Sequence, residues 1–332
     1  MVITSLGLYN FLYIHSKRFF FVIFMFVWFM FFLSSCYKDC GQNGEKSLKV
    51  VATIFPQYDF VKQLTKDVKN VDVKMLVPPG ADMHCFELTP QNVMDIKNCD
   101  LFVCVGGKSE VYVKEILKSI DCEKVKVVSL LTVVGEDKNF DDEKSHEHLK
   151  EDEPQKDEHV WTSLKNCSKI VEALTKELCK IDEKNSNSYK ANESKYLKEI
   201  NNLYEEFKGF IVKNPNKVVV FGDKFPFYWF FKDYEEYGLK YLAAYEGCSS
   251  HGDVNFKNLQ NVINYVKKNK IPVVFKLEQS KGDIAKTISE ETGAAVRTFY
   301  SCHGCSKEDF EKGETFLGII KKNVKTLKEA LV

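Results

Sequence analysis

KVVATIF, residues 49–55, is the stretch that decides the fold, because five of its seven residues are apolar and adjacent positions do not alternate with polar ones. A strand with that composition is typical of a parallel sheet covered on both faces. Pro56 follows directly, and Phe60, Val61 and Leu64 then recur on one face of a predicted helix. Residues 49–64 therefore predict a buried strand followed by a helix, which is the repeating unit of an α/β fold.

The same unit recurs on both sides of the middle of the chain. Strands are predicted at 71–77, 101–105 and 125–131, and again at 217–221, 239–243, 272–276 and 295–300. Helical segments separate them, and a last helix is expected to carry Phe310, Phe316 and Leu331. Strands that alternate with helices imply mainly parallel sheets with right-handed crossovers. The fold class is α/β, with two lobes of mainly parallel sheet flanked by helices.

Two long helices are predicted between these halves, at 164–181 and 186–213. The second has Tyr196, Ile200, Leu203, Phe207 and Ile211 at spacings of three or four residues, which makes one apolar stripe. A helix over 186–213 would be about 40 Å long. We expect it to act as a rigid backbone between an N-terminal lobe (48–185) and a C-terminal lobe (214–332), with a ligand cleft between them.

The first 35 residues have the pattern of an export signal. Lys17 and Arg18 precede an apolar run that ends in Leu33-Ser34-Ser35-Cys36. The sequence before Cys36 matches a bacterial lipobox, so we expect residues 1–35 to be removed and Cys36 to be lipidated. The tether 36–47 would then connect the lipid to the fold on the outer face of the cell membrane. An uncleaved transmembrane anchor is the alternative, although seventeen residues is short for a span.

Composition excludes several classes of protein. Removing residues 1–35 takes away two basic residues and no acid, which leaves 45 basic and 47 acidic side chains, or a formal charge of −2. A nucleic-acid partner is not expected without a basic face. The eleven cysteines are scattered through a chain that is long enough to form a core without disulfides. About 285 residues remain for folding, which favours two domains.

The segment 136–158 interrupts the strand–helix alternation. It contains eleven acidic residues, four lysines, His146 and His148, and almost no apolar side chain. Such a segment cannot bury enough surface to order itself. We expect a mobile surface loop, with both histidines in solvent.

Four other histidines are placed where a ligand site is expected. His84, His251 and His303 each follow a predicted strand, and Glu278 follows another. His159 directly precedes a segment that leads into the helix at 164–181. Ligands of open α/β sheets bind at the carboxyl ends of the strands. Several imidazoles and a carboxylate converging there predict a site for Zn²⁺ or Mn²⁺.

Beyond the tether, the chain resembles the zinc- and manganese-binding cluster of solute-binding lipoproteins of bacterial ABC transporters. Three segments carry the resemblance: 51-VATIFP-56, 76-LVPPGADMH-84 with Thr89-Pro90, and 157-DEHVW-161 with the acidic loop before it. The resemblance implies two α/β lobes joined by one long helix. It also implies that His84 and His159 are metal ligands from the first lobe.

The second lobe departs from the commonest pattern of that family. Many members have a ligand histidine where this chain has 222-GDKFPF-227, and a carboxylate where it has His303. We therefore expect His303 to be the leading ligand from the second lobe. Glu278 and His251 compete for the remaining position, and Asp223 is a possible neighbour of the site. The predicted metal ligands are His84, His159, Glu278 and His303.

These expectations describe a lipid-anchored, extracytoplasmic receptor that captures Zn²⁺, with Mn²⁺ as the alternative. It would deliver the metal to an ABC permease with its ATPase, as a monomer and without catalysis. The motif Cys302-His303-Gly304-Cys305 leaves one rival open, a thiol–disulfide oxidoreductase. A secreted zinc hydrolase is disfavoured because no His-Glu-x-x-His motif is present. An adhesive surface protein is a third alternative.

Overall fold

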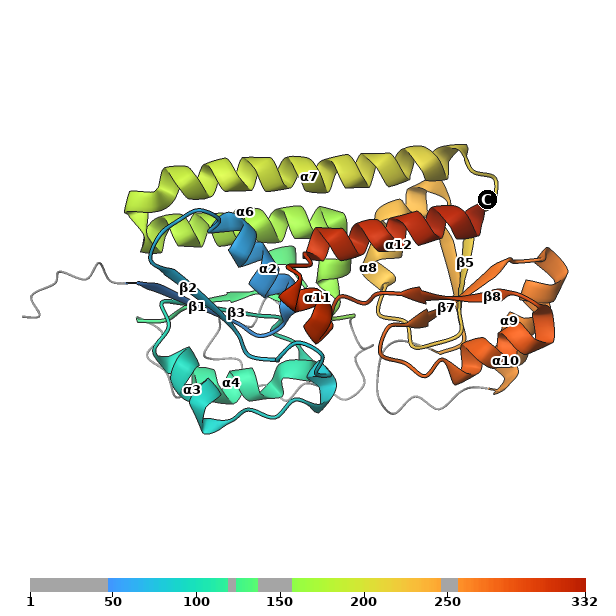
Figure 1. Ribbon diagram of the computed structural model, residues 1–332, viewed down its shortest axis with the longest axis horizontal. Coiled ribbons are helices and arrows are strands. Elements are labelled where there is room, and N and C mark those ends of the chain that lie inside the picture. Colours follow the sequence, from blue (N-terminus) through green and yellow to red (C-terminus); the bar gives the residue numbers. More distant parts are fainter. Residues whose placement is uncertain (1–46, 119–123, 137–156, 246–255) are drawn as a thin grey trace, which may run out of the picture. The chain divides into compact units, whose positions relative to one another are not determined.

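The computed structural model describes residues 47–118, 124–136, 157–245 and 256–332 (Figure 1). Their strands form two four-stranded parallel sheets with the same topology. The first has the order β2-β1-β3-β4, and the second has the order β6-β5-β7-β8. In each sheet the chain adds its second strand on one side of the first and then moves to the other side. The predicted α/β class with two parallel sheets is confirmed.

The elements before the long helices belong to the first sheet or cover it. They are β1 (Leu48–Ala52), α2 (Phe55–Leu64), β2 (Val71–Met75), 3-10 helix η1 (Met83–Cys85), α3 (Pro90–Lys97), β3 (Leu101–Cys104), η2 (Lys108–Glu110), α4 (Val111–Leu117), β4 (Lys126–Ser129) and α5 (Leu130–Val134). The elements that follow are η3 (Val160–Thr162), α6 (Leu164–Ile181), η4 (Glu183–Asn185) and α7 (Ser186–Lys213).

The second sheet and its helices complete the chain. They are β5 (Val218–Phe221), α8 (Tyr228–Tyr234), η5 (Glu235–Tyr237), β6 (Lys240–Ala243), α9 (Phe256–Asn269), β7 (Val273–Leu277), α10 (Asp283–Thr292), β8 (Ala295–Phe299), α11 (Lys307–Glu311) and α12 (Phe316–Leu331).

The long helix α7 has the predicted bounds, and its predicted apolar stripe is buried. It runs beside α6 and α12 (Figure 1). Side chains from one face of each sheet meet under these helices in a single hydrophobic cluster, which includes Val50 and Val103 of the first sheet and Phe221 and Phe275 of the second. The two sheets therefore share a core. The division into lobes 48–185 and 214–332 stays a prediction.

The opposite face of each sheet has a core of its own. Val51 and Phe102 of the first sheet pack with Val113 of α4. Val220 and Val274 of the second sheet pack with helices α9 and α10. Because neighbouring side chains of a strand point to opposite faces, Val50 and Val51 belong to different cores. This double coverage explains why the strands are continuously apolar.

Two predicted strands extend into the helices that follow them. The strand predicted at 49–55 ends at Ala52, because the Ile54 N–H donates to Gln57 Oε1 at 2.9 Å and Phe55 begins α2. The strand predicted at 125–131 ends at Ser129, whose hydroxyl accepts from Thr132 N at the start of α5.

The last predicted helix is two helices. Gly313 lies in the left-handed region at φ +77°, between α11 and α12. The Thr315 hydroxyl then accepts from Gly318 N at 3.1 Å, which caps the start of α12. The break lets Phe310 and Phe316 pack in different places, against Tyr58 and Phe60 of α2.

Within the residues that the structure describes, no helix is both long and apolar enough to cross a membrane. Residues 1–46 lie outside the described part of the chain. They include the expected signal 1–35, the expected lipidated Cys36 and all but the last residue of the tether 36–47, so these stay predictions.

The close approach of β5 to α10 generates a stability prediction. A Cβ added to Gly222 would lie 2.5 Å from Ala285 Cα, whereas a Cβ on Gly209 of α7 would meet nothing within 4 Å. We expect Gly222→Ala to destabilise the fold by about 2 kcal/mol or more, because backbone must move. Gly209→Ala should stabilise it by about 0.5–1 kcal/mol through helix propensity. Urea unfolding of both variants tests this, and equal effects would contradict it.

Candidate metal centre

His159 is held at the start of η3 by the residue two positions before it. Its backbone N–H donates to Asp157 Oδ1 at 2.8 Å, and its ring Nδ1 lies 2.8 Å from the same oxygen. A carboxylate can only accept, so Nδ1 carries the hydrogen and Nε2 has the lone pair that can bind a metal. The Asp157 carbonyl oxygen in turn accepts from Trp229 Nε1 of α8 at 2.8 Å.

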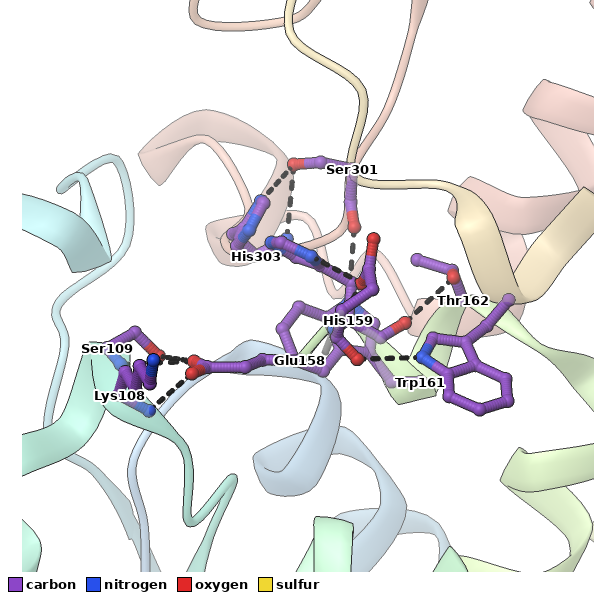
Figure 2. A network of polar contacts seen from close by, with 10 residues as sticks. Lys108, Ser109, Glu158, His159, Trp161, Thr162, Ser301 and His303 are labelled. Carbon is purple, nitrogen blue, oxygen red and sulfur yellow. Dashed lines mark hydrogen bonds and ion pairs between the residues drawn. The ribbon is translucent and has the colours of Figure 1, made fainter. Parts of the chain in front are cut away.

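His303 comes from the loop after β8 and faces His159 (Figure 2). The two ring centroids are 4.7 Å apart and the rings are nearly perpendicular, at 86°. Trp161 contacts both rings edge to face, and its Nε1 donates to the Ser301 carbonyl oxygen at 3.2 Å. Two histidines 144 positions apart in sequence are therefore brought together against one buried indole.

Glu278 follows β7 and is directed at Ser301. Its carboxylate accepts from Ser301 N at 3.0 and 3.2 Å and from Ser301 Oγ at 2.8 Å. Burial raises the pKa of Glu278, and the hydrogen bonds from Ser301 oppose that shift. The Ser301 hydroxyl also lies 2.5 Å from His303 Nδ1. The structure thus connects Glu278 to His303 through Ser301.

The other predicted residues have different positions. The backbone of His84 lies in η1, and its side chain is not described. Four residues earlier, the Gly80 N–H donates to Cys305 O of the loop after β8 at 2.8 Å. Asp223 accepts from Lys224 N at 2.8 Å and Leu277 N at 3.1 Å, so it supports the backbone beside Glu278. His251, His146 and His148 lie outside the described residues.

Among the side chains that the structure describes, which leave out those of His84 and His251, no group of three or more His, Cys, Asp or Glu is close enough to hold a metal ion. The described part of the centre is the pair His159 and His303. The structure thus places His159 and His303 side by side, as predicted. The ligand roles of all four predicted residues, including His84 and Glu278, stay predictions.

Sequence reasoning missed the role of Glu158. Its carboxylate accepts from Lys108 N, from Ser109 N at 3.0 Å and from Ser109 Oγ at 2.5 Å (Figure 2). The expected solvated loop 136–158 is therefore wrong for Asp157 and Glu158, whereas residues 137–156 lie outside the described residues. The acidic composition of the segment hid the fact that its last two carboxylates bind donors within the fold.

The two thiols beside His303 are buried. Cys302 is fully buried and Cys305 is 4% exposed. Burial raises the pKa of Cys302 well above its ordinary value and that of Cys305 to about 11. A thiol nucleophile for disulfide exchange needs a lowered pKa and access to solvent. Neither thiol has the environment of a redox pair.

Known proteins resemble the chain over nearly its whole described length. The model of the family "ZnuA: Zinc-uptake complex component A periplasmic" matches residues 50–330. The high-affinity zinc uptake system protein ZnuA of Bacillus subtilis is 28% identical over 318 residues, which cover 91% of this chain and 97% of that protein. The zinc-binding lipoprotein AdcA of Streptococcus pneumoniae is 28% identical over 304 residues. The match to AdcA covers 90% of this chain but only 58% of AdcA.

A solved structure gives the same result for the fold. The metal-dependent lipoprotein YcdH of Bacillus subtilis superposes with a TM-score of 0.70 at 28% identity, covering 86% of this chain and 99% of that one.

The contact between Glu158 and Gly107 can be tested by rescue. A Cβ on Gly107 would lie 2.5 Å from both Glu158 carboxylate oxygens, although the Gly107 backbone at φ −95° accommodates any residue. We expect Gly107→Ala to destabilise the fold by about 0.5–1.5 kcal/mol, because Glu158 must leave its exposed and half-buried donors. Gly107→Ala combined with Glu158→Ala should be no less stable than Glu158→Ala alone. Thermal unfolding measures all three variants, and additive losses would contradict the steric explanation.

Proposed function

This chain belongs to the ZnuA family of periplasmic zinc-uptake components, and we propose that it captures Zn²⁺ outside the cytoplasm and delivers it to a membrane permease. The observation that carries the proposal is the facing pair His159 and His303, with ring centroids 4.7 Å apart. Each Nδ1 is held from behind by an oxygen, at 2.8 Å from Asp157 and 2.5 Å from Ser301. Imidazoles oriented in this way are typical of zinc sites.

His84 is the proposed third ligand. It belongs to the same segment as Gly80, whose N–H donates to Cys305 O, two residues after His303. The loop that carries His84 therefore contacts the loop that carries His303. Three neutral imidazoles would suit Zn²⁺ better than Mn²⁺, which prefers carboxylate and water oxygens. Mn²⁺ is the alternative cargo, and His251 is the remaining histidine candidate for a fourth position.

The family name describes one component of an uptake complex. We propose that the partners are an ABC permease and its ATPase, and that lipidated Cys36 holds the chain at the outer face of the cell membrane as a monomer. The relative ZnuA of Bacillus subtilis is named as part of a high-affinity zinc uptake system. Capture and delivery of an ion need no chemical step, so the role proposed for this chain is not enzymatic.

Loss of affinity in histidine variants tests the proposed ligands. We expect His84→Ala, His159→Ala and His303→Ala each to weaken Zn²⁺ binding by at least 100-fold, because a zinc site has only about four ligands and each variant removes one. Affinity of the unaltered chain should fall as the pH drops through the histidine range, since protons compete with the metal. Competition of the metal-stripped chain against a chromophoric chelator, with Zn²⁺ and Mn²⁺, measures these affinities.

Deletion of residues 138–156 is the matched control. It removes the two remaining histidines of the acidic loop and leaves Asp157 and Glu158 in place. We expect it to leave the equilibrium affinity within a factor of about three, a change below 1 kcal/mol. A chain that bound neither metal, or a loop deletion that abolished binding, would contradict the proposal.

The rival thiol oxidoreductase makes a different prediction. Because burial raises the pKa of both Cys302 and Cys305, we expect neither thiol to react with a thiol-specific reagent at pH 7 faster than a free cysteine does. The double variant Cys302→Ala with Cys305→Ala should still bind Zn²⁺. Rapid modification of either thiol, with loss of a disulfide reductase activity in the double variant, would favour the rival.

A further inference from the structure

We propose that Glu278 and Ser301 form a relay that fixes the metal-binding tautomer of His303, so that Glu278 acts on the metal through Ser301 and is not itself a ligand. This inference rests on the proposed function, zinc capture by His303. It assigns Ser301 as a positioning residue, a role that the sequence did not suggest, and it replaces the predicted ligand role of Glu278.

The contacts of Glu278 give the first step. Both of its oxygens accept from Ser301 N, at 3.0 and 3.2 Å, and Oε1 lies 2.8 Å from Ser301 Oγ. A backbone N–H can only donate, so the carboxylate is the acceptor in this group. The Ser301 hydroxyl then donates its one hydrogen to Glu278. Every donor of Ser301 is used by this carboxylate.

The direction of the next hydrogen bond follows. Ser301 Oγ has given its hydrogen to Glu278, so it can only accept from His303 Nδ1 at 2.5 Å. The hydrogen therefore resides on Nδ1, and Nε2 has the lone pair that binds a metal. The relay has the same outcome at His303 as the direct Asp157 contact has at His159.

The relay is held from both sides. The Ser301 carbonyl oxygen accepts from Trp161 Nε1 at 3.2 Å. The neighbouring Tyr300 exchanges two hydrogen bonds with Asn323 of α12, with Tyr300 N donating to Oδ1 at 2.9 Å and Nδ2 donating to Tyr300 O at 2.8 Å. Ser301 and Asn323 are 4% and 2% exposed. The hydroxyl that orients His303 therefore has little freedom to turn away.

This arrangement has a consequence for metal choice. To become a ligand, Glu278 would have to share its two oxygens between the metal and the N–H and O–H of Ser301, which would weaken the hydrogen bonds that orient His303. With its carboxylate kept on Ser301, the metal meets imidazole nitrogens. Nitrogen ligands favour Zn²⁺, whereas carboxylate ligands favour Mn²⁺. Ser301 would thus contribute to the selectivity of the site without touching the metal.

A double-mutant cycle on the full chain distinguishes the relay from direct ligation. Ser301→Ala and Glu278→Gln should each weaken Zn²⁺ binding by 10- to 100-fold, the range for outer partners of ligating histidines. Because both changes interrupt one chain of hydrogen bonds, the double variant should bind no more weakly than the weaker single variant. Competition against a chromophoric chelator gives the four affinities. Loss of affinity in Glu278→Gln with Ser301→Ala unchanged would overturn the relay.

Ser163→Ala is the matched control. The Ser163 hydroxyl donates to the buried carboxylate of Asp233 at 2.8 Å, as Ser301 does to Glu278. The partners of this pair among the described residues are Lys165 and Asn166, and neither is an imidazole. The Ser163→Ala variant should be less stable than the unaltered chain and should bind Zn²⁺ with the same affinity. If Ser163→Ala and Ser301→Ala lost Zn²⁺ affinity equally, the loss in Ser301→Ala would be due to general destabilisation of the fold. That result would overturn the relay.

A second readout does not depend on metal binding. In ¹⁵N-labelled, metal-free chain at pH 8, the side chain of His303 should show the hydrogen on Nδ1, and Ser301→Ala should shift it toward a mixture of tautomers. An unchanged tautomer in Ser301→Ala would overturn the relay even where affinity falls. If the unaltered chain shows the expected tautomer but binds no Zn²⁺, the proposed function fails and the positioning of His303 stands.

Discussion

The buried carboxylate of Asp59 connects three helices that belong to different parts of the chain. It accepts from Phe316 N at the start of α12 at 3.0 Å, from Gln63 of its own helix α2 at 3.1 Å, and from the Tyr196 hydroxyl of α7 at 3.5 Å. Burial raises the pKa of Asp59 to about 6, against the effect of these donors. Because the free N–H groups at a helix start need acceptors, this carboxylate fixes where α12 begins.

The position of α12 determines where the preceding loop can lie. The chain leaves β8 at Phe299 and has to reach Phe316 beside α2, so the segment 300–315 crosses to the first half of the chain. Gly80 N–H and Trp161 Nε1 then bind its carbonyl groups at Cys305 and Ser301. His303 is held in place by residues of the first half, although it follows a strand of the second sheet. The facing histidines are therefore held by contacts between the two halves of the chain.

Sequence-based prediction was most accurate for elements with a long regular pattern of apolar residues. Helix α7 was predicted with its observed bounds because five stripe positions over four turns agree, whereas the strand at 49–55 was overextended because Ile54 and Phe55 are equally apolar in a helix. The contact of Glu278 with Ser301 could not be read in this way. It depends on register, since Leu277 pairs with Phe299 and the residues that follow leave the sheet side by side. Composition likewise could not separate Glu158, which binds Ser109, from solvated acids.

Carboxylates and imidazoles have separate tasks in the proposed centre, and the fold explains why. Asp157 and Glu278 both place a carboxyl group near the site, and carboxylates are common metal ligands. Each accepts a hydrogen bond from a backbone N–H, that of His159 in one case and that of Ser301 in the other. Both carboxylates therefore lie behind an imidazole ring, and in the proposed centre the two rings supply the ligands. In the proposed centre, a ligand set of imidazole nitrogens would favour Zn²⁺ over Mn²⁺.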